Sequence, residues 1–359
     1  MTDKILITGA CGFTGSHMVA QANKAFPNDK IIATDLEKTE RNEYYTEIDA
    51  DGHPQPVYYE DYFKKFDVDF IPADLTNPKD VQQLFSAVPF DYIFHTASLF
   101  DYFVEQELLF TVNVTGTKNL FEEIVTTSPS TEVIHWSTLG VLGGAGFDSP
   151  KNETSAYNPH NKYCESKVAQ ERLVKSYDTN TTIIRPAPIY GPRHNYGVYH
   201  ILKILQKLPV VPILQMYPRH KRYQFPAVHV HDITQAALYL AKNNTDYSVY
   251  NVLNDCITQE ELLQLLTDKL QCKYITIPFP HVAYSPLTTV IEQVSEINET
   301  RNRRNDSRPI VDAPMIHYLS NNMWFSNNRL KESGYKFTYS TTKDGLNEYI
   351  DWCYENGKL

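Results

Sequence analysis

The first half of the chain alternates short apolar runs with longer segments whose apolar residues recur at helical spacing. This alternation is typical of a parallel sheet built from strand–helix–strand units. It predicts strands at residues 4–8, 30–34, 69–71, 92–96, 133–137 and 182–185. It predicts helices at residues 16–25, 78–87, 114–125 and 163–177. The pattern therefore indicates an α/β protein with a doubly wound parallel sheet of the Rossmann type.

Two regions depart from this rhythm. A polar, tyrosine-rich stretch at 37–65 is predicted to be an insertion after the second strand, and the sequence assigns no function to it. Beyond Arg185, frequent prolines break the chain into short pieces, which indicates a smaller, irregular layer over the carboxyl edge of the sheet, where such sheets bind ligands. We expect the strand at 227–230 to return to the first domain. The predicted division is a cofactor domain at 1–185, joined by 223–250, and a substrate-binding region at 186–222 and 251–359.

The formal net charge of −10 argues against a general nucleic-acid surface, which needs concentrated positive charge. The one dense basic run consists of Arg301, Arg303, Arg304 and Arg308. It is either a solvated loop or a contact for an anionic substrate or a lipid head group. We expect a small molecule as the substrate.

Five scattered cysteines without a C-x-x-C pair indicate neither a disulfide framework nor a zinc site. No apolar run approaches the roughly 18–20 residues that span a bilayer, and a strand is expected almost at the N-terminus, where a signal peptide would lie. We expect a soluble, cytoplasmic protein without a membrane span.

A glycine-rich turn lies between the first predicted strand and the first predicted helix. Gly9 permits the tight turn, Gly12 lets the backbone approach a pyrophosphate, and Gly15 allows close packing of helix on strand. Phe13 and Thr14 lie in this turn and are expected cofactor contacts, just before a helix whose free N–H groups and dipole favour a diphosphate. The spacing predicts a dinucleotide site.

An acidic residue twenty positions further on, Asp35, ends the second predicted strand. A carboxylate there accepts hydrogen bonds from the adenosine ribose and repels the extra phosphate of NADP. We therefore predict NAD as the cofactor, while the nearby Lys38 keeps NADP as the less favoured alternative.

Further cofactor contacts are expected at the ends of the next two strands. Asp74 and Leu75 either meet the adenine ring or belong to the N-cap region of a helix before Pro78. Small residues at the end of the fourth strand let the backbone line the dinucleotide, or are ordinary strand-end packing: Thr96, Ala97 and Ser98.

The candidate catalytic pair is Tyr163 and Lys167, one helical turn apart on one helix face. A tyrosine is a poor base near neutrality because its pKa is about 10. We expect the lysine and a positive nicotinamide ring to lower this pKa, and the lysine to hold the nicotinamide ribose. Upstream, Ser137 and Thr138 supply hydroxyls for a substrate carbonyl or alcohol.

These motifs occur in one order along nearly the whole chain. They are Thr8-Gly-x-x-Gly-x-x-Gly15, Asp35, Asp74-Leu75, Asn113-Val-Thr-Gly-Thr117, Ser137-Thr138, Tyr163-x-x-x-Lys167 and Arg185-Pro-x-x-Ile-Tyr-Gly-Pro192. In this the chain resembles the extended short-chain dehydrogenase/reductase family.

The resemblance assigns roles to further positions. It places the family's hydroxyl residue on Thr138, with Ser137 as second choice, and cofactor contacts at Asn113, Pro186 and Ile189. Asn113 has the alternative of a helix N-cap before Val114. Leu142 replaces a tyrosine that is frequent in the family, which puts a polar substrate contact there in doubt. The resemblance also implies a homodimer that pairs through helices including the one that carries Tyr163.

Two branches of the family compete for the substrate. Nucleotide-sugar epimerases and dehydratases typically have an asparagine where this chain has Pro188, but Arg222 occupies a place where that branch often binds phosphate. The branch similar to 3β-hydroxysteroid dehydrogenases fits the apolar stretch 275–287 and the tail 325–335. We prefer the second branch, with a sterol-like or lipid-like substrate and with Tyr190 and Arg222 as substrate contacts.

The resulting hypothesis is reversible oxidation of a secondary alcohol, with Tyr163 as the base and Thr138 steadying the oxyanion. A protein that senses NAD without turnover stays open as a different class. His229 and His231, two apart on the strand expected there, could begin a metal site, but no third ligand accompanies them, and we predict none.

Overall fold

The computed structural model describes residues 3–36, 43–48, 54–58, 63–66, 68–86, 89–100, 104–243, 247–304 and 313–359. Its centre is a seven-stranded sheet in the order β12-β8-β7-β6-β1-β2-β5. Every neighbouring pair in it is parallel. The strands are β1 (Lys4–Thr8), β2 (Lys30–Thr34), β5 (Val68–Phe70), β6 (Tyr92–His95), β7 (Glu132–Trp136), β8 (Asn180–Pro186) and β12 (Val249–Val252). The predicted fold class is confirmed.

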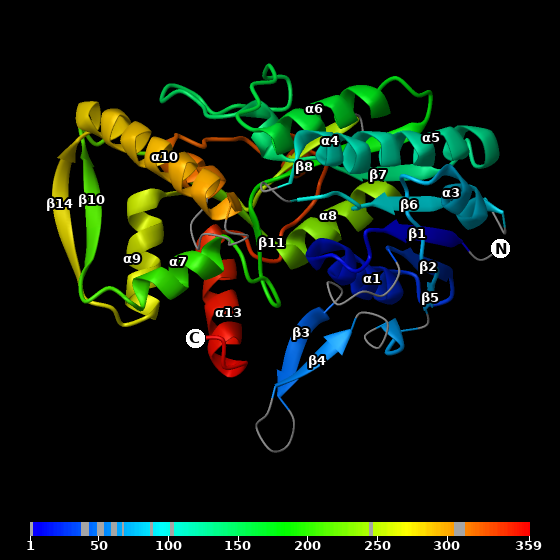
Figure 1. Cartoon of the computed structure of the whole chain (residues 1–359), viewed down its shortest axis with the longest axis horizontal. Helices are drawn as coiled ribbons and strands as arrows, with labels where there is room; N and C mark the ends of the chain where they lie inside the picture. The colour runs from blue at the N-terminus through cyan, green and yellow to red at the C-terminus, as the bar shows by residue number, and fades with distance from the viewer. Residues whose placement is uncertain are drawn as a thin grey trace.

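Helices cover both faces of this sheet (Figure 1). The flanking helices are α1 (Phe13–Ala25), α3 (Pro78–Phe85), α4 (Gln106–Phe110), α5 (Gly116–Thr127), α6 (Lys162–Val174) and α8 (Val230–Lys242). Successive strand residues point to opposite faces, so Ile5 and Ile7 enter the core with α1 and α8, and Leu6 enters the core with α3 and α5. Burial on both faces explains why the strands read as continuous apolar runs.

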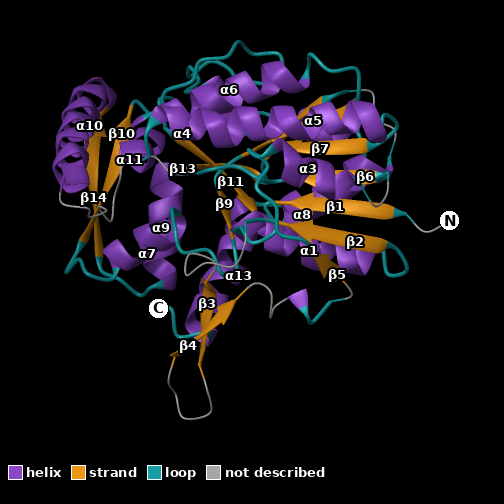
Figure 2. Cartoon of the chain, turned by 45° about the vertical axis from the view of Figure 1, so that its right-hand side comes forward, coloured by secondary structure: helices purple, strands orange, loops and turns teal. Residues whose placement is uncertain are grey.

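Smaller sheets build the remainder of the molecule. One has three strands, β9 (Ile189–Tyr190), β11 (Gln224–His229) and β13 (Asp255–Thr258). Another pairs β10 (Val211–Tyr217) with β14 (Tyr274–Pro280). Their helices are α7 (Val198–Leu205), α9 (Gln259–Lys269), α10 (His281–Arg304), α11 (Ala313–Ser320), α12 (Asn328–Glu332) and α13 (Thr342–Glu355). The insertion at 37–65 contains the hairpin of β3 (Glu43–Ile48) and β4 (Pro54–Tyr58), which projects from the molecule in Figure 2.

Two expectations about element bounds need correction, and the return of the strand at 227–230 to the first domain stays a prediction. The expected strand 227–230 is part of β11, which pairs with β9 and β13; the seventh strand of the large sheet is β12. The helix that follows β11, α8, does pack against α1 and the large sheet. The helix expected at 114–125 continues a helical stretch from Gln106 through one π-helical turn, Thr111–Thr115. Helix α1 begins at Phe13, earlier than expected. The division of the chain at residue 185 stays a prediction.

Two findings concern the charged and apolar segments. Arg301, Arg303 and Arg304 lie in the last turn of α10 and not in a loop, and Arg308 lies outside the described residues. Within the ranges given above, no helix combines the length and apolar character needed to cross a bilayer.

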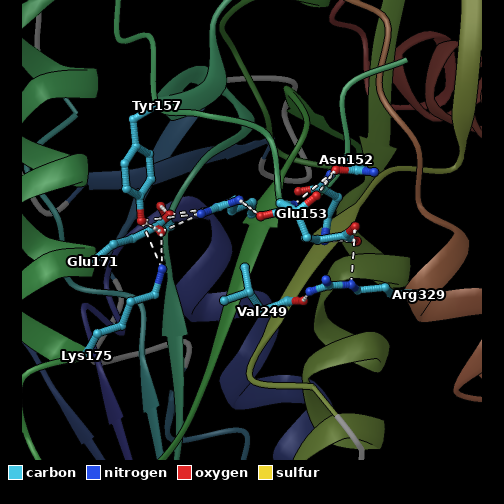
Figure 3. Close-up of polar contacts among 11 residues, drawn as sticks. Asn152, Glu153, Tyr157, Glu171, Lys175, Val249 and Arg329 are labelled. Atoms are coloured by element: carbon cyan, nitrogen blue, oxygen red, sulfur yellow. Dashed lines mark hydrogen bonds and ion pairs between the residues drawn. The ribbon is translucent and has the colours of Figure 1, made fainter. Parts of the chain in front are cut away.

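A buried ion pair fastens α6 to the sheet (Figure 3). Arg185 of β8 donates from Nε to Glu171 Oε1 at 2.8 Å and from Nη2 to Glu171 Oε2 at 2.7 Å. Ser137 and Tyr157 donate hydroxyl hydrogen bonds to the same carboxylate, at 2.5 and 2.7 Å. Burial by itself would raise the pKa of Glu171, but hydrogen bonds from Arg185 and its charge, with those from the two hydroxyls, hold this pKa at about 2.

The network continues to the edge of the sheet. Arg185 Nη1 donates to the backbone oxygen of Glu153 at 3.1 Å. The Glu153 carboxylate accepts the backbone N–H of Asn251 in β12 at 3.0 Å and lies 3.8 Å from Arg329 Nε of α12. The same set of contacts therefore ties α6, β8, β12 and α12 together.

Replacing Glu171 with glutamine should lower the free energy of unfolding by about 3 kcal/mol at neutral pH, because it leaves the buried Arg185 without its counter-charge. The folded-state pKa of about 2 lies below the unfolded value of about 4.3. The stabilisation is thus complete above the unfolded pKa and is lost as pH falls towards the folded pKa. Urea unfolding at several pH values should show the gap between wild type and Glu171→Gln closing over that window.

Lys175→Gln is the matched control, since Lys175 reaches the same carboxylate from solvent at 3.4 Å. We expect its effect to stay below about 1 kcal/mol. Equal losses in the two variants, or a gap that does not depend on pH, would contradict this account.

Candidate active site

The glycine turn after β1 allows backbone segments to approach one another closely. Gly9 has φ +68°, and a Cβ there would lie 2.6 Å from the backbone of Ala97. A Cβ on Gly15 would lie 2.0 Å from the oxygen of Gly9. Gly12 is the N-cap of α1 and has no side chain to cap the helix. The N–H groups of the first turn, which begins with Phe13 and Thr14, have no intrahelical partners and can hold an anion.

Asp35 stands beside this turn at the end of β2. Its Oδ2 accepts the backbone N–H of Cys11 at 2.8 Å, and its Oδ1 accepts that of Leu36 at 2.8 Å. Burial raises the pKa of Asp35, and these two hydrogen bonds oppose the shift. Each carboxylate oxygen keeps a second lone pair, so the group can also accept from ribose hydroxyls. Lys38 lies outside the described residues.

Asp74 and Leu75 lie in the loop between β5 and α3. Asp74 Oδ1 accepts from the backbone N–H and the hydroxyl of Thr76, each at 2.8 Å, while the N-cap of α3 is Asn77. Leu75 contributes its backbone oxygen to Asn119 Nδ2 at 2.9 Å. The Asp74 carboxylate therefore closes a turn and is not the helix cap.

The end of β6 connects the glycine turn to α6. Thr96 donates its hydroxyl to the oxygen of Thr8 at 2.7 Å. Ser98 donates to Asn113 Oδ1 at 3.1 Å and accepts from Lys167 Nζ at 3.4 Å. The segment Thr96, Ala97 and Ser98 thus lies between the turn and the candidate catalytic helix.

Asn113 lies inside the π-helical turn and is buried, so its alternative as a helix N-cap is wrong. Its Oδ1 also accepts the N–H of Leu99 at 2.7 Å, and its Nδ2 donates to Ser166 of α6 at 2.9 Å. The wider π-turn sets this amide between β6 and α6, as π-turns often do at functional sites.

Tyr163 and Lys167 are both buried in α6, at 8% and 1% exposure. Lys167 Nζ donates to the backbone oxygen of Trp136 at 2.6 Å. Burial lowers the pKa of Lys167 to about 7, against the raising effect of Glu171. Tyr163 shares a hydrogen bond with Ser98, and the ring of Phe100 packs against it edge-on at 5.0 Å.

Our expectation that Lys167 lowers the pKa of Tyr163 is not met by the chain alone. Burial raises this pKa, and the nearby Cys164 adds to the increase, while the hydrogen bond with Ser98 opposes it. In a low-dielectric site the charged phenolate is disfavoured unless a positive charge lies beside it. Burial also lowers the pKa of Lys167, to about 7, so a positive charge on a bound cofactor would add to that of the lysine beside Tyr163.

Two buried histidines near Lys167, His95 and His135, were not predicted as site residues. His95 connects the hydroxyls of Thr8 and Thr117, at 2.7 and 2.8 Å. Its ring lies 5.3 Å from that of His135. Burial, followed by the charge of Lys167, lowers the pKa of both histidines, that of His95 to about 3. Both are therefore neutral at pH 7 and leave Lys167 without a competing positive charge.

The two candidate hydroxyls after β7, those of Ser137 and Thr138, have different partners in the structure. Ser137 donates to the buried Glu171, so it serves the ion pair and the structure does not favour it as a substrate contact. Thr138 caps the short helix Leu139–Leu142 by accepting the N–H of Gly140 at 3.2 Å, and it shares a hydrogen bond with Tyr318. The geometry thus favours Thr138.

Helix α11 brings residues to the site that no sequence motif marks. Tyr318 meets Thr138, and the ring of His317 stacks on that of His160 at 3.7 Å and 9°. His160 Nδ1 is 3.9 Å from Cys164 Sγ, next to Tyr163. Thr138 and Tyr318 are 180 positions apart along the chain, so only the tertiary fold could reveal their contact.

The remaining predicted contacts are two for the cofactor, Pro186 and Ile189, and two for the substrate, Tyr190 and Arg222. Pro186 ends β8 and is buried, and Ile189 lies half-buried in β9. Tyr190 is fully buried, packs on His229, and donates to the oxygen of Thr342 at 3.3 Å. Its predicted substrate contact is therefore wrong, because it belongs to the core. Arg222 is partly exposed and lies 3.6 Å from the Glu261 carboxylate.

The histidine pair is not arranged as a strand would place it. His229 ends β11 and contacts Glu348 at 2.9 Å, whereas His231 lies in the first turn of α8. Among the described residues, no group of three or more His, Cys, Asp or Glu side chains could hold a metal ion.

Gly15→Ala should weaken dinucleotide binding about tenfold, because a Cβ 2.0 Å from the Gly9 oxygen forces the turn and α1 apart. Titration with NAD, followed by protein fluorescence, measures this. Gly146→Ala is the control, since a Cβ there meets nothing within 4 Å. Equal affinities in the two variants would show that the turn does not hold the dinucleotide.

Curated relatives of the chain include enzymes of two chemistries. It is 30% identical to a dTDP-D-glucose 4,6-dehydratase of Dictyostelium discoideum over 53% of this chain and 44% of that one. It is also 30% identical to a decarboxylating sterol-4-alpha-carboxylate 3-dehydrogenase of Candida albicans over 52% of this chain and 51% of that one. The match thus spans about half the length of these relatives.

Solved structures share the fold along the entire chain. A dTDP-glucose 4,6-dehydratase of Bacillus anthracis in complex with NAD has a TM-score of 0.68 at 17% identity, over 99% of this chain and 98% of that one. A UDP-glucose 4-epimerase of Thermus thermophilus in complex with NAD has a TM-score of 0.65 at 20% identity, over 97% and 98%.

The glycine turn, the uncapped N-terminus of α1 and Asp35 fit a dinucleotide diphosphate and its ribose. The model of the NAD dependent epimerase/dehydratase family matches residues 5–252. The chain therefore belongs to the NAD-dependent epimerase/dehydratase family.

Proposed function

We propose that the protein interconverts a secondary alcohol and a ketone on an apolar, sterol-like or lipid-like substrate. The observation that carries this proposal is the position of Arg222, the candidate diphosphate contact, 3.6 Å from the Glu261 carboxylate. A nucleotide sugar brings two phosphates, and the Glu261 carboxylate beside Arg222 would oppose their binding there by charge repulsion. Pro188 stands where that branch typically has an asparagine, and Tyr190 is buried, so fewer polar contacts are left for a sugar.

The dinucleotide would lie along the carboxyl ends of the parallel strands. We assign its diphosphate to the turn of Gly9, Gly12 and Gly15 with the N–H groups of Phe13 and Thr14, and its adenosine ribose to Asp35. The loop of Asp74 and Leu75 would meet the adenine. The segment of Thr96, Ala97 and Ser98 would line the middle of the dinucleotide, Pro186 and Ile189 its nicotinamide end, and Asn113 would hold this segment in place. When bound, NAD accepts the hydride from the carbinol carbon or returns it to the ketone.

The chain's own residues manage the proton. In oxidation the Tyr163 phenolate takes the substrate hydroxyl proton, and Thr138 donates a hydrogen bond to the substrate oxygen. Lys167 is held by the Trp136 oxygen and Ser98, where it can donate to the nicotinamide ribose. Because His95 and His135 are neutral, neither adds a positive charge that would oppose protonation of Lys167 when anionic groups come near.

A nucleotide-sugar epimerase or dehydratase is the second candidate. Its support is the 30% identity to the dTDP-D-glucose dehydratase, equal to that of the sterol dehydrogenase. The same alcohol oxidation would then open an epimerisation or dehydration cycle.

We also propose a homodimer that pairs through the helices beside α6. Leu108 of α4 and Val125 of α5 are exposed at 48% and 44%, which suits such an interface. The five cysteines, all in the described ranges, form no disulfide, which suits a reducing compartment such as the cytoplasm.

Tyr163→Phe should leave NAD affinity nearly unchanged and reduce turnover at least about 100-fold, because only the ionisable hydroxyl is removed. NAD titration and NADH absorbance separate the two effects. Tyr274→Phe, on the distant strand β14, is the control and should keep full activity. Full turnover in Tyr163→Phe would refute the role of the phenol.

A substrate screen decides the branch. We expect NADH formation with a hydroxysterol or related apolar secondary alcohol, no reaction with nucleotide sugars, and the same activity in Arg222→Ala, because Arg222 would touch no phosphate. Turnover of a nucleotide sugar with a KM raised by Arg222→Ala would establish the second candidate instead. Tight NAD binding without turnover of any compound would indicate a non-catalytic NAD-binding protein.

A further inference from the structure

The loop 191–197 connects β9 to α7 and is held from two sides. His17 Nε2 of α1 lies 3.0 Å from the backbone oxygen of Pro192. Tyr349 of α13 donates its hydroxyl to the backbone oxygen of His194 at 2.7 Å. The loop therefore lies between the C-terminal helix of the chain and the helix that follows the glycine turn.

Aromatic rings form a continuous row from the glycine turn to the candidate catalytic tyrosine. Phe13, in the first turn of α1, stacks on His194 with ring centres 4.5 Å apart. The ring of His194 lies 6.4 Å from that of Tyr196 in the same loop, and Tyr196 lies 5.6 Å from Phe100, which follows β6. Phe100 packs edge-on against Tyr163 at 5.0 Å. We call His194, Tyr196 and Phe100 the aromatic row.

The aromatic row connects two residues that lie at opposite ends of the nicotinamide half of NAD in the proposed function. Phe13 belongs to the turn assigned to the diphosphate, and Tyr163 belongs next to the nicotinamide ring. The nicotinamide half of a bound dinucleotide has to extend from the first of these residues to the second. The aromatic row therefore runs along that half.

Two members of the row have surface or polar atoms that a ligand could contact. Phe100 is 50% exposed, although its ring packs against the buried Tyr163. His194 Nδ1 is buried and has no hydrogen-bond partner among the residues that the structure describes. Buried polar atoms without a partner are rare in native proteins. A ligand beside the row could supply this partner and cover the exposed ring.

The charge of His194 also suits a ligand contact. Burial, followed by the charge of His200, lowers the pKa of His194 to about 3. The imidazole is therefore neutral at pH 7, and one of its two nitrogens carries a hydrogen that it can donate. A hydrogen bond from such a donor to a phosphate oxygen is strengthened by the charge of the phosphate.

We propose that the aromatic row forms one wall of the cofactor site: His194 donates from Nδ1 to the diphosphate, and Tyr196 and Phe100 cover the nicotinamide half. Aromatic rings pack well against a flat ring and exclude water from it. The row thus holds the nicotinamide next to Tyr163 and slows the release of the dinucleotide. This inference rests on the cofactor assignment of the proposed function, but not on its substrate.

Titration with two ligands of different length tests the two rings. ADP contains only the adenosine and the diphosphate, whereas NAD adds the nicotinamide half. Tyr196→Ala and Phe100→Ala should each bind ADP like the wild type and NAD about tenfold more weakly, because only the covered half loses contacts. Calorimetry measures both affinities, and stopped-flow fluorescence should show faster release of NADH from the two variants.

Two variants of His194 test its hydrogen bond. His194→Phe keeps a ring to stack on Phe13 but lacks Nδ1, so it should weaken ADP and NAD by the same factor, about tenfold. His194→Asn keeps an N–H donor close to the backbone and should bind ADP more tightly than His194→Phe.

Tyr354→Ala is the control, since it removes a ring that is 44% exposed on α13 and outside the row. It should bind both ligands like the wild type. Equal weakening of ADP and NAD in Tyr196→Ala and Phe100→Ala would indicate a general loosening of the site and overturn the inference, as would wild-type NAD affinity in both variants. Wild-type protein that binds neither ligand would refute the cofactor assignment together with this inference. No substrate takes part in these titrations, so failure of the proposed reaction is detected separately.

Discussion

The ion pair between Glu171 and Arg185 determines where helix α6 lies on the sheet. Its carboxylate also holds Ser137, which precedes Thr138, and its arginine reaches the backbone at Glu153. One buried pair therefore positions both the helix that carries Tyr163 and Lys167 and the loop that carries Thr138. A buried charge pair that is also hydrogen-bonded to Ser137, Tyr157 and the Glu153 backbone has little freedom to shift, which suits a site that needs fixed distances.

Burial then determines the electrostatics of that site. It lowers the pKa of Lys167 to about 7, makes His95 and His135 neutral, and raises the pKa of Tyr163. The protein without its cofactor thus holds a neutral phenol beside an amine whose pKa burial has lowered. A positive nicotinamide ring would supply the missing charge, so the proton-transfer group would be activated only where the hydride acceptor is present.

The far side of the site is built from the C-terminal part of the chain. Helix α11 places Tyr318 against Thr138 and His317 against His160, and α10 supports α11 from outside.

The sequence by itself determined the sheet, the glycine turn and the Tyr163–Lys167 pair. Strands and turns leave local signals: buried parallel strands are runs of apolar residues, a tight turn needs glycine, and residues four apart share a helix face. The seventh strand, the core position of Tyr190 and the engagement of Ser137 with Glu171 carried no such signal. Neither did the contact of Tyr318 with Thr138. These depend on which distant segments pack together, and burial and pKa follow from that packing, so only the tertiary structure could decide them.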